Sequence, residues 1–500
     1  MSDNNNKIDE QEQQQVALDD DDEENFIDLD HAVEVEEGNG DVPMDEDDGD
    51  DDENANENGE GEGDVETNEG KKADVVEDMS IQTISSHMPS SVFTVATYLN
   101  KESNTLSIIS GGGDDKAFLH KIANDNVLTT MALNHEHTDS VSSIATNESL
   151  VTSDLKKTPK YVAVGAYDGT VVLYNPDTGE KIQVLDGPTD VEFIAFHPKG
   201  GSVLLAGSIS DATVWMYHLP TSKCLQVFVG HESSGDGGGV TSGSFTPDGK
   251  FALTIGMDGT MRLWAPRTGM CRHVFKFHNS DGGGMQDQHD ARGLTCLAVD
   301  GGSDGQLAIA GGEDGSAHVV HLQGKKVVAT LRHFDITQGV GSGMAVDDEE
   351  EEVMMTSVEA VGFASKDVNS NWVATGGSDG RLKIWDLTFD GGQCRQVCEV
   401  KDEQTGGVTR LKWHPNMPVI IASYSDAAVR LWDARNGSLI KTLTGGNSGE
   451  DNQINDISVE FFNTENGGGG SAVIVTANDD GNTKVYNVDI GAVIAQNQQM

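Results

Sequence analysis

Histidine and serine residues in suggestive local patterns are the first features of this sequence that could do chemistry. His137 lies two residues before Asp139, and His231 follows a glycine at the start of a later segment. Such side chains serve as general bases or as metal ligands in many proteins. The string GxSxG, which surrounds the nucleophile of many hydrolases, occurs around Ser303 and again around Ser378.

None of these patterns has the context that its chemistry requires. A serine nucleophile needs a turn between a strand and a helix, and no helical pattern follows either serine. The phosphate-binding motif GxxxxGK[ST], the zinc motif HExxH and the pair Cys-x-x-Cys are absent. We therefore predict that the protein is not an enzyme and has no catalytic residue, no metal site and no cofactor. A catalytic group assembled from distant segments is the alternative that the sequence leaves open.

Acidic residues dominate the composition. The 500 residues include 84 acids and 32 bases, which gives a formal net charge of −52. Residues 1–80 alone hold 33 acids and 3 lysines, a balance of −30. A charge of this sign repels the phosphates of nucleic acids and anionic lipids. It favours a basic protein as partner, because opposite fields steer the two molecules together.

The N-terminal segment 1–79 has the composition of a disordered tail. Its acidic runs, Asp19–Glu24 and Asp45–Asp52, are separated by Asn, Gln and Gly, so the segment has little apolar surface to bury. A further acidic run, Asp347–Glu352, lies in the longest insertion of the remaining chain. We expect the tail to be either a solvated segment or a flexible acidic arm that shields a basic ligand.

The compartment follows from what the sequence lacks. The first residues contain no apolar stretch of a secretory signal, and no run of 18 apolar residues could span a membrane. The 5 cysteines are too scattered for a disulfide framework, which fits a reduced intracellular setting. We predict a cytoplasmic protein that binds neither membrane nor nucleic acid directly, with the nucleus left open as a second compartment.

A repeated motif organises the chain beyond residue 80. Short apolar runs alternate there with turns of Gly, Asp, Ser and Asn, a pattern typical of an all-β domain. In each repeat a turn aspartate is followed six residues later by an aromatic residue or its substitute, such as His120 or Val320. The eight turn aspartates are Asp114, Asp168, Asp211, Asp258, Asp314, Asp379, Asp426 and Asp480. Their spacing is that of WD repeats with insertions, whose period is about 40–45 residues.

Eight such repeats predict an eight-bladed WD40 β-propeller over residues 80–490, between the acidic tail (1–79) and a short C-terminal tail (491–500). One four-stranded sheet cannot bury both of its faces, so the blades must close into a ring. The last repeat has room for three strands, and we predict that Ser80–Ser85 supplies the fourth. In this setting His137, Asp139 and His231 are expected to belong to a buried hydrogen-bond network of the blades.

Several stretches resemble the angio-associated migratory cell protein family. They are Gly111–Phe118, Val191–Pro198, Leu204–Tyr217, Pro247–Trp264 and Arg430–Leu439. The resemblance extends over residues 80–490 and includes a fungal chaperone of ribosome assembly. It implies a non-enzymatic propeller, a monomer, whose acidic face binds the basic N-terminal segment of a large-subunit ribosomal protein and delivers it to the 60S subunit. An animal member linked to cell migration leaves a signalling scaffold as the alternative, and an acidic tail would also suit a histone chaperone.

Five acidic residues are candidates for the partner-binding rim. Propeller ligands usually meet residues just before the turn aspartate and residues at the start of the inner strands. The acids at these positions are Glu192, Glu313, Glu359, Asp456 and Asp479. A single exposed ion pair contributes only about 0–1 kcal/mol, so binding would need several of them and would weaken with salt.

Overall fold

The computed structural model describes residues 78–100, 103, 105–123, 128–147, 161–199, 202–232, 238–277, 293–301, 306–334, 356–400, 405–446, 452–462 and 470–497. All of them belong to one compact unit of the chain. The acidic run at 347–352, Ser303 and all but the last two residues of the expected tail 1–79 lie outside the described residues. No helix in the described part of the chain is long and apolar enough to cross a membrane.

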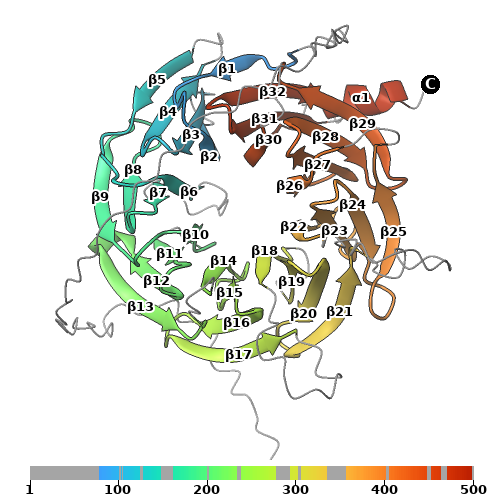
Figure 1. Ribbon diagram of the computed structural model, residues 1–500, viewed down its shortest axis with the longest axis horizontal. Helices are drawn as coiled ribbons and strands as arrows, with labels where there is room; N and C mark the ends of the chain where they lie inside the picture. Colours follow the sequence, from blue (N-terminus) through green and yellow to red (C-terminus); the bar gives the residue numbers. More distant parts are fainter. Residues whose placement is uncertain are drawn as a thin grey trace, which may run out of the picture. The chain divides into compact units, whose positions relative to one another are not determined.

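Eight sheets of four antiparallel strands form a closed ring, which confirms the predicted eight-bladed propeller (Figure 1). Blades 1 to 8 follow the order in which their first strands occur in the chain. The first strand of each blade contacts the first strands of the blades on both sides. We call this circle of eight first strands the inner ring.

The first two strands of each blade lie nearest the centre of the ring. From blade 1 to blade 8, the first strands are β2 (Val92–Asn100), β6 (Val141–Thr146), β10 (Phe193–Phe196), β14 (Val240–Phe245), β18 (Leu294–Val299), β22 (Val358–Phe363), β26 (Val408–Trp413) and β30 (Ile454–Phe462). The second strands, in the same order, are β3 (Thr105–Gly112), β7 (Val162–Ala166), β11 (Val203–Gly207), β15 (Ala252–Gly256), β19 (Leu307–Gly312), β23 (Trp372–Gly377), β27 (Val419–Tyr424) and β31 (Ser471–Asn478).

The third and fourth strands complete each sheet toward its outer edge. Third strands are β4 (Ala117–Ile122), β8 (Thr170–Tyr174), β12 (Thr213–His218), β16 (Thr260–Ala265), β20 (Ser316–His321), β24 (Leu382–Asp386), β28 (Ala428–Asp433) and β32 (Thr483–Asp489). Fourth strands are β5 (Leu128–Ala132), β9 (Lys181–Asp186), β13 (Lys223–Val229), β17 (Met270–Lys276), β21 (Lys326–Arg332), β25 (Gln393–Cys398), β29 (Ser438–Thr444) and, in blade 8, β1 (Gln82–Ile84). A short 3-10 turn, η3 (Leu219–Thr221), connects β12 to β13.

Burial follows the position of a strand in its blade. The second strands are almost continuously apolar, and every residue of β7, β11 and β15 is buried. Neighbouring blades cover both faces of these strands, so an alternating apolar and polar pattern is not required. Fourth strands face solvent, and four of the five residues of β5 are exposed. The core therefore lies between the blades, in layers of Val, Ile, Leu and Ala.

The turn between the second and third strands is the same in all eight blades. The residue after each turn aspartate has a positive φ: Asp115, Gly169, Ala212, Gly259, Gly315, Gly380, Ala427 and Gly481. Glycine adopts this left-handed backbone without strain, whereas a residue with a Cβ pays about 1–2 kcal/mol. We call the end of the propeller with these turns, and with the connections between blades, the turn face. The other end is the opposite face.

A strand from the N-terminal side of the chain closes the ring. Strand β1 pairs antiparallel with β32, with Thr83 opposite Lys484, which confirms the prediction that Ser80–Ser85 completes blade 8. Just before β1, Asp78 forms a bridge with Gly445, at the end of the fourth strand of blade 7. The N–H of Met79 donates to Thr444 O at 2.9 Å. The chain therefore enters the propeller at the turn-face edge of blades 7 and 8.

The C-terminal segment packs on the opposite face of the last two blades. Helix α1 (Ile490–Asn497) follows directly on β32 (Figure 1). Asp489 accepts the N–H of Ala492 at 2.9 Å, a typical N-cap contact. Ile490 is fully buried in an apolar cluster with strands of blades 7 and 8. The segment 491–500, which the sequence sets apart as a short tail, is thus helical as far as Asn497.

Candidate functional site

One turn aspartate lies at the turn face of every blade, between the second and third strands. They are the eight repeat aspartates found in the sequence, from Asp114 to Asp480. In seven of the eight, the carboxylate accepts a hydrogen bond from the backbone N–H two residues later. A side chain placed in this way imitates a backbone turn. These aspartates therefore hold the reversal between the two central strands.

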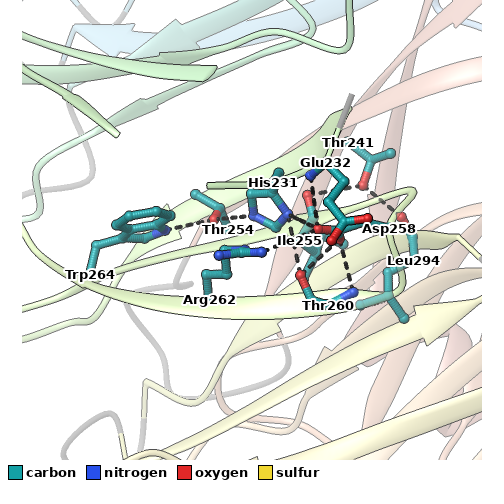
Figure 2. A network of polar contacts seen from close by, with 10 residues as sticks. All are labelled: His231, Glu232, Thr241, Thr254, Ile255, Asp258, Thr260, Arg262, Trp264 and Leu294. Atoms are coloured by element: carbon teal, nitrogen blue, oxygen red, sulfur yellow. Dashed lines mark hydrogen bonds and ion pairs between the residues drawn. The ribbon is translucent and has the colours of Figure 1, made fainter. Parts of the chain in front are cut away.

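A buried polar network surrounds the turn aspartate of blade 4 (Figure 2). The Asp258 carboxylate lies 3.1 Å from Nδ1 of His231 and accepts the Thr260 N–H at 3.0 Å. Nε2 of His231 is 2.7 Å from Thr254 Oγ1, which also accepts the indole N–H of Trp264 at 2.8 Å. Burial alone would raise the pKa of Asp258, but the hydrogen bonds and the charge of His231 bring it down to about 2. We call these five residues the blade 4 network.

This network is structural, because nothing in it can reach a substrate. The side chains of His231 and Asp258 are 1% and 4% exposed, and both ring nitrogens of the histidine have partners inside the blade. A general base must come within hydrogen-bond reach of the proton that it removes. The prediction that His231 belongs to a buried network of the blade is therefore confirmed.

His137 confirms the same prediction in blade 2, whereas Asp139 does not. Nδ1 of His137 lies 3.1 Å from the turn aspartate Asp168. Asp139 is exposed, and its carboxylate accepts only the N–H of Ser140, at 2.7 Å, among the hydrogen bonds of the described residues. The prediction that Asp139 joins the buried network is therefore wrong. The turn aspartate, 31 residues after His137, takes the place that the local spacing assigned to Asp139.

Two substituted positions keep the network in other blades. His120 stands where blade 4 has Trp264, and its Nε2 lies 2.9 Å from Ser110 Oγ. Burial lowers the pKa of His120 to about 4, so the ring is neutral at physiological pH. In blade 8, Asn452 replaces the missing histidine and donates to the Asp480 carboxylate at 3.0 Å. Changes that look like losses in the sequence are therefore compensated by other donors.

The structure shows no catalytic context for the remaining serine motif. Ser378 lies in the turn between β23 and β24, and its hydroxyl accepts the N–H of Ser357 at 3.0 Å. A strand, not a helix, follows it. The described residues also contain no group of three or more His, Cys, Asp or Glu side chains placed to hold a metal ion.

The turn end of the inner ring is built from one repeated pair of positions. A buried aliphatic residue comes first in every blade: Val92, Val141, Val191, Val240, Leu294, Val358, Val408 and Ile454. The residues that follow it are Phe93, Ser142, Glu192, Thr241, Thr295, Glu359, Thr409 and Asn455. Four of these donate a hydrogen bond to the carbonyl of the buried residue in the next blade: Ser142, Thr241, Thr295 and Asn455. This position therefore links neighbouring blades.

Glu192 of blade 3 and Glu359 of blade 6 occupy the same position without making that link. An ionised carboxylate has no hydrogen to donate to a carbonyl. Glu192 accepts the hydroxyl of Tyr167 at 3.2 Å, and Glu359 accepts the hydroxyl of Ser357. Neither forms an ion pair with a Lys or Arg among the described residues. We call these two residues the inner-ring carboxylates.

The surroundings of Glu192 concentrate negative charge. Burial raises the pKa of its carboxyl, the Tyr167 hydrogen bond lowers it, and the nearby Asp190 raises it further. Tyr167 is 38% exposed, and burial together with Glu192, Asp190 and Asp139 raises its pKa. A cation bound here would favour the charged form of these carboxyls and could contact the tyrosine ring.

The other three predicted acids have partners within the propeller. Glu313, directly before the turn aspartate of blade 5, is exposed and accepts the N–H of Gly293 at 2.9 Å. Asp479 accepts the side-chain amide of Asn455 at 2.7 Å. Asp456 reaches across from blade 8 to blade 1, where it accepts the N–H of Val95 at 3.1 Å. The structure thus brings Glu192, Glu359 and Asp456 to the inner ring, with Glu313 and Asp479 on the turns around it.

Sequence reasoning missed two aromatic residues and one base on this face. Tyr167 stands directly before a turn aspartate, the same position as Glu313 and Asp479, so the positional rule would have found it. Phe93 follows the buried residue of blade 1 and is 37% exposed. Arg410, in β26, lies 3.6 Å from Asp456 through its Nε. A search restricted to acids passed over all three.

The opposite face has a different character. A cavity of about 800 Å³ lies there, at the far ends of the first strands of blades 5, 6 and 7. Its lining includes Phe363, Trp413, Lys366 and Lys412, with Asp367 beside them. Both lysines are exposed. The inner-ring carboxylates and these lysines therefore lie at opposite ends of the same ring of strands.

The chain is similar in sequence to known WD-repeat proteins. The sequence profile described as "Nucleolar protein 10-like, N-terminal domain" matches residues 261–492, and that of "WD domain, G-beta repeat" matches residues 222–265. Angio-associated migratory cell protein of Homo sapiens is 30% identical over 398 residues, which cover 80% of this chain and 78% of that protein.

Two solved structures have the same fold at low sequence identity. Sqt1 of Saccharomyces cerevisiae matches with a TM-score of 0.63 and 17% identity, over 83% of this chain and 100% of that one. Sqt1 of Chaetomium thermophilum, solved bound to the N-terminus of the ribosomal protein L10, matches with a TM-score of 0.60 and 19% identity, over 82% of this chain and 100% of that one.

Proposed function

Because this chain belongs to the angio-associated migratory cell protein family, we propose that it is a non-enzymatic chaperone of a basic ribosomal protein of the large subunit. Its turn face binds the basic N-terminal segment of this client and releases it to the assembling 60S subunit. The protein acts as a monomer in the cytoplasm, without direct contact to nucleic acid or membrane. The Chaetomium thermophilum protein of the same fold, bound to the N-terminus of ribosomal protein L10, supports the class of client.

The observation that carries the proposal is the pair of inner-ring carboxylates. Glu192 and Glu359 stand where Ser142, Thr241 and Thr295 of other blades tie the ring together. At these two places the ring lacks the hydrogen bond to the carbonyl of the next blade. It has instead two carboxylates that form no ion pair with a Lys or Arg among the described residues. Such carboxylates are available to the lysines and arginines of a client.

The acidic tail would add to the same field. The chain enters the propeller through Asp78, at the turn-face edge of blades 7 and 8. The residues before that point hold most of the −30 charge of residues 1–80. A field of one sign near a binding face raises the rate at which oppositely charged partners arrive, and salt screens this effect. The tail would therefore speed capture of the client more than it slows release.

Binding of client peptides to the full-length protein tests the proposal. We expect the N-terminal peptide of a basic large-subunit ribosomal protein to bind, with an affinity that falls steeply from about 50 to about 300 mM salt. A peptide of the same length with its lysines and arginines changed to glutamine is the matched control and should not bind. Isothermal titration calorimetry measures both.

Two results would overturn the proposal. One is the absence of selective, salt-sensitive binding to any basic ribosomal peptide. The other is a set of partners, purified from growing cells, that contains signalling or cytoskeletal proteins and no ribosomal protein or pre-ribosomal particle. That second outcome would favour a scaffold, and recovery of histones would favour a histone chaperone.

A further inference from the structure

Arg410 is the one base among the residues that build the turn end of the inner ring. Two positions follow the buried aliphatic residue of each first strand, and Arg410 is the only Lys or Arg at either of them in the eight blades. Its side chain is 53% exposed. Its Nη1 donates to the carbonyl of Thr409 at 3.0 Å, and its Nε lies 3.6 Å from Oδ1 of Asp456.

The Asp456 carboxylate is held in place independently of Arg410. Its Oδ2 accepts the N–H of Val95 at 3.1 Å and the hydroxyl of Thr94 at 3.3 Å, across the junction of blades 8 and 1. Its Oδ1 accepts the N–H of Ile457 at 2.9 Å. A carboxylate fixed in this way presents the same geometry to any cation that approaches it, so binding requires little rearrangement.

The contact between Arg410 and Asp456 is loose by comparison with another ion pair of the propeller. Arg430 and Asp426 in blade 7 approach to 2.6 Å, and the Arg430 side chain is only 7% exposed. Tight charge-assisted hydrogen bonds measure about 2.7–2.9 Å, so the 3.6 Å contact of Arg410 is a weak one. A half-exposed arginine in a weak contact can leave at small cost.

The charge of Arg410 also extends over the rest of the ring. Burial and the nearby Asp190 raise the pKa of Glu192 in blade 3, and the charge of Arg410 acts against them. Burial raises the pKa of the Cys296 thiol in blade 5 to about 12; Glu359 adds to this effect, and the charge of Arg410 acts against it. Arg410 therefore partly compensates the same carboxylates that the proposed client would use.

We propose that Arg410 is an internal competitor of the client, occupying Asp456 in the free protein and giving way to a lysine or arginine of the client. This inference rests on the proposed function and adds to it the residue that sets affinity. The free protein keeps one carboxylate of the ring occupied by its own cation. Binding exchanges one cation for another at this point, so the complex is weaker than the acidic face alone would make it, and release to the ribosome is easier.

The test compares two charge-removing substitutions on the same strand. Arg410→Gln should bind the basic ribosomal N-terminal peptide about two- to fivefold more tightly than the unchanged full-length protein, the range for loss of one exposed competing ion pair. Lys412→Gln removes the same charge two residues away, but Lys412 lines the cavity of the opposite face. The peptide affinity of the Lys412→Gln protein should therefore stay within about 1.5-fold of that of the unchanged protein. Isothermal titration calorimetry at one salt concentration measures all three proteins.

A second comparison separates competition from a general loss of positive charge. In an Asp456→Asn background, Arg410→Gln should tighten binding clearly less, because the contested carboxylate is gone and only the longer-range effect of Arg410 on Glu192 remains. Three outcomes would overturn the inference. Arg410→Gln and Lys412→Gln could tighten binding equally, or Arg410→Gln could leave the affinity unchanged. Arg410→Gln could also tighten binding by the full amount in the Asp456→Asn background. These results leave the proposed function intact, since the peptide still binds. Absence of binding by every variant would overturn the proposed function and this inference together.

Discussion

The blade 4 network and the inner-ring carboxylates use the same chemical group on the same face for opposite purposes. Asp258 is 4% exposed and is satisfied by a histidine, a threonine and an arginine, the last at 3.6 Å. Glu192 and Glu359 each accept a hydrogen bond from one neutral hydroxyl and form no ion pair among the described residues. The carboxylate of Asp258 is fully engaged by the fold, whereas those of Glu192 and Glu359 are the ones that we propose for the client.

This contrast shows how a repeat protein separates structure from binding. The turn aspartate fixes a reversal that every blade needs, so it recurs eight times. The position after the buried residue of each first strand is less constrained, because four blades use it for a link and the ring closes without the other four. Function can be placed at such a position without unfolding a blade.

The largest expected effect comes from removing the centre of the blade 4 network. Asp258→Ala leaves the buried donors of His231, Thr260 and Arg262 without an acceptor, which should lower the free energy of unfolding by about 3 kcal/mol. The matched control is Asp314→Ala in blade 5, whose exposed carboxylate accepts only the Ser316 N–H among the described residues and should lose under about 1 kcal/mol. Denaturation in urea measures both, and equal losses would remove the distinction between the two turns.

The same network predicts an acid limit for stability. The pKa of Asp258 is about 2 in the folded protein and near 3.8 when unfolded. Its contribution is therefore fully present above about pH 4 and is lost as the pH falls toward 2. The Asp258→Ala protein should lack this part of the pH dependence.

A second prediction concerns the histidine that replaces tryptophan in blade 1. The pKa of His120 is about 4 when folded and 6.5 when unfolded, so protons bind the unfolded chain first as the pH falls. Stability should drop by about 2 kcal/mol between pH 8 and pH 5 for this reason alone. In His120→Phe that slope should become shallower, although the protein loses the Ser110 contact at every pH. An unchanged slope in thermal unfolding across this range would contradict the assignment.

Reversing the inner-ring carboxylates should act on binding and not on the fold. Glu192→Lys together with Glu359→Lys should weaken binding of the basic peptide by about tenfold or more, since two attractions become repulsions. The unfolding free energy should change by only about 1 kcal/mol, because the two substitutions remove one hydrogen bond between blades 2 and 3, from Tyr167 to Glu192, and one within blade 6. The control Lys366→Glu with Lys412→Glu changes an equal charge on the opposite face and should not weaken binding. If the two double substitutions weakened binding of the peptide equally, the turn face would not be the binding face.

The smallest expected effect concerns the backbone of the turns. Ala427 has a φ of 59° at a position where five blades have glycine. Ala427→Gly relieves this strain, which costs about 1–2 kcal/mol, but the more flexible glycine loses more entropy on folding. The net effect should be a stabilisation of about 0.5–1 kcal/mol. Peptide affinity should stay unchanged, because the turn carries no partner contact in the proposed site. A destabilised Ala427→Gly protein in urea denaturation would show that the turn is not strained.

Much of the fold could be read from the sequence because its constraints are local. Each turn needs an Asp followed by a residue with left-handed backbone, so it is visible in the sequence as a motif of two adjacent residues. Eight copies of this motif predict eight blades. The strand that closes the ring was also predictable, since the last repeat is one strand short. The helix at Ile490–Asn497 was not predicted, because its packing against blades 7 and 8 leaves no repeat pattern in so short a segment.

The candidate site was only partly predictable from sequence. The rule for rim positions found Glu192 and Glu359, but it could not tell them from Asp456 and Asp479, which support the junction of blades 8 and 1. Nor could it pair His137 with Asp168 rather than with Asp139, because a distance of 31 residues along the chain closes only when the blade forms.

The number of blades, the closing strand and the acidity of the molecule follow from the sequence alone, since each depends on residue types at a regular spacing or on total charge. Which carboxylates are free depends instead on the folded arrangement. A side chain's partners come from other strands and other blades, and Arg410 meets Asp456 across 46 residues of sequence. Whether a charge stabilises the fold or is left for a client depends on those neighbours, which the order of residues does not show.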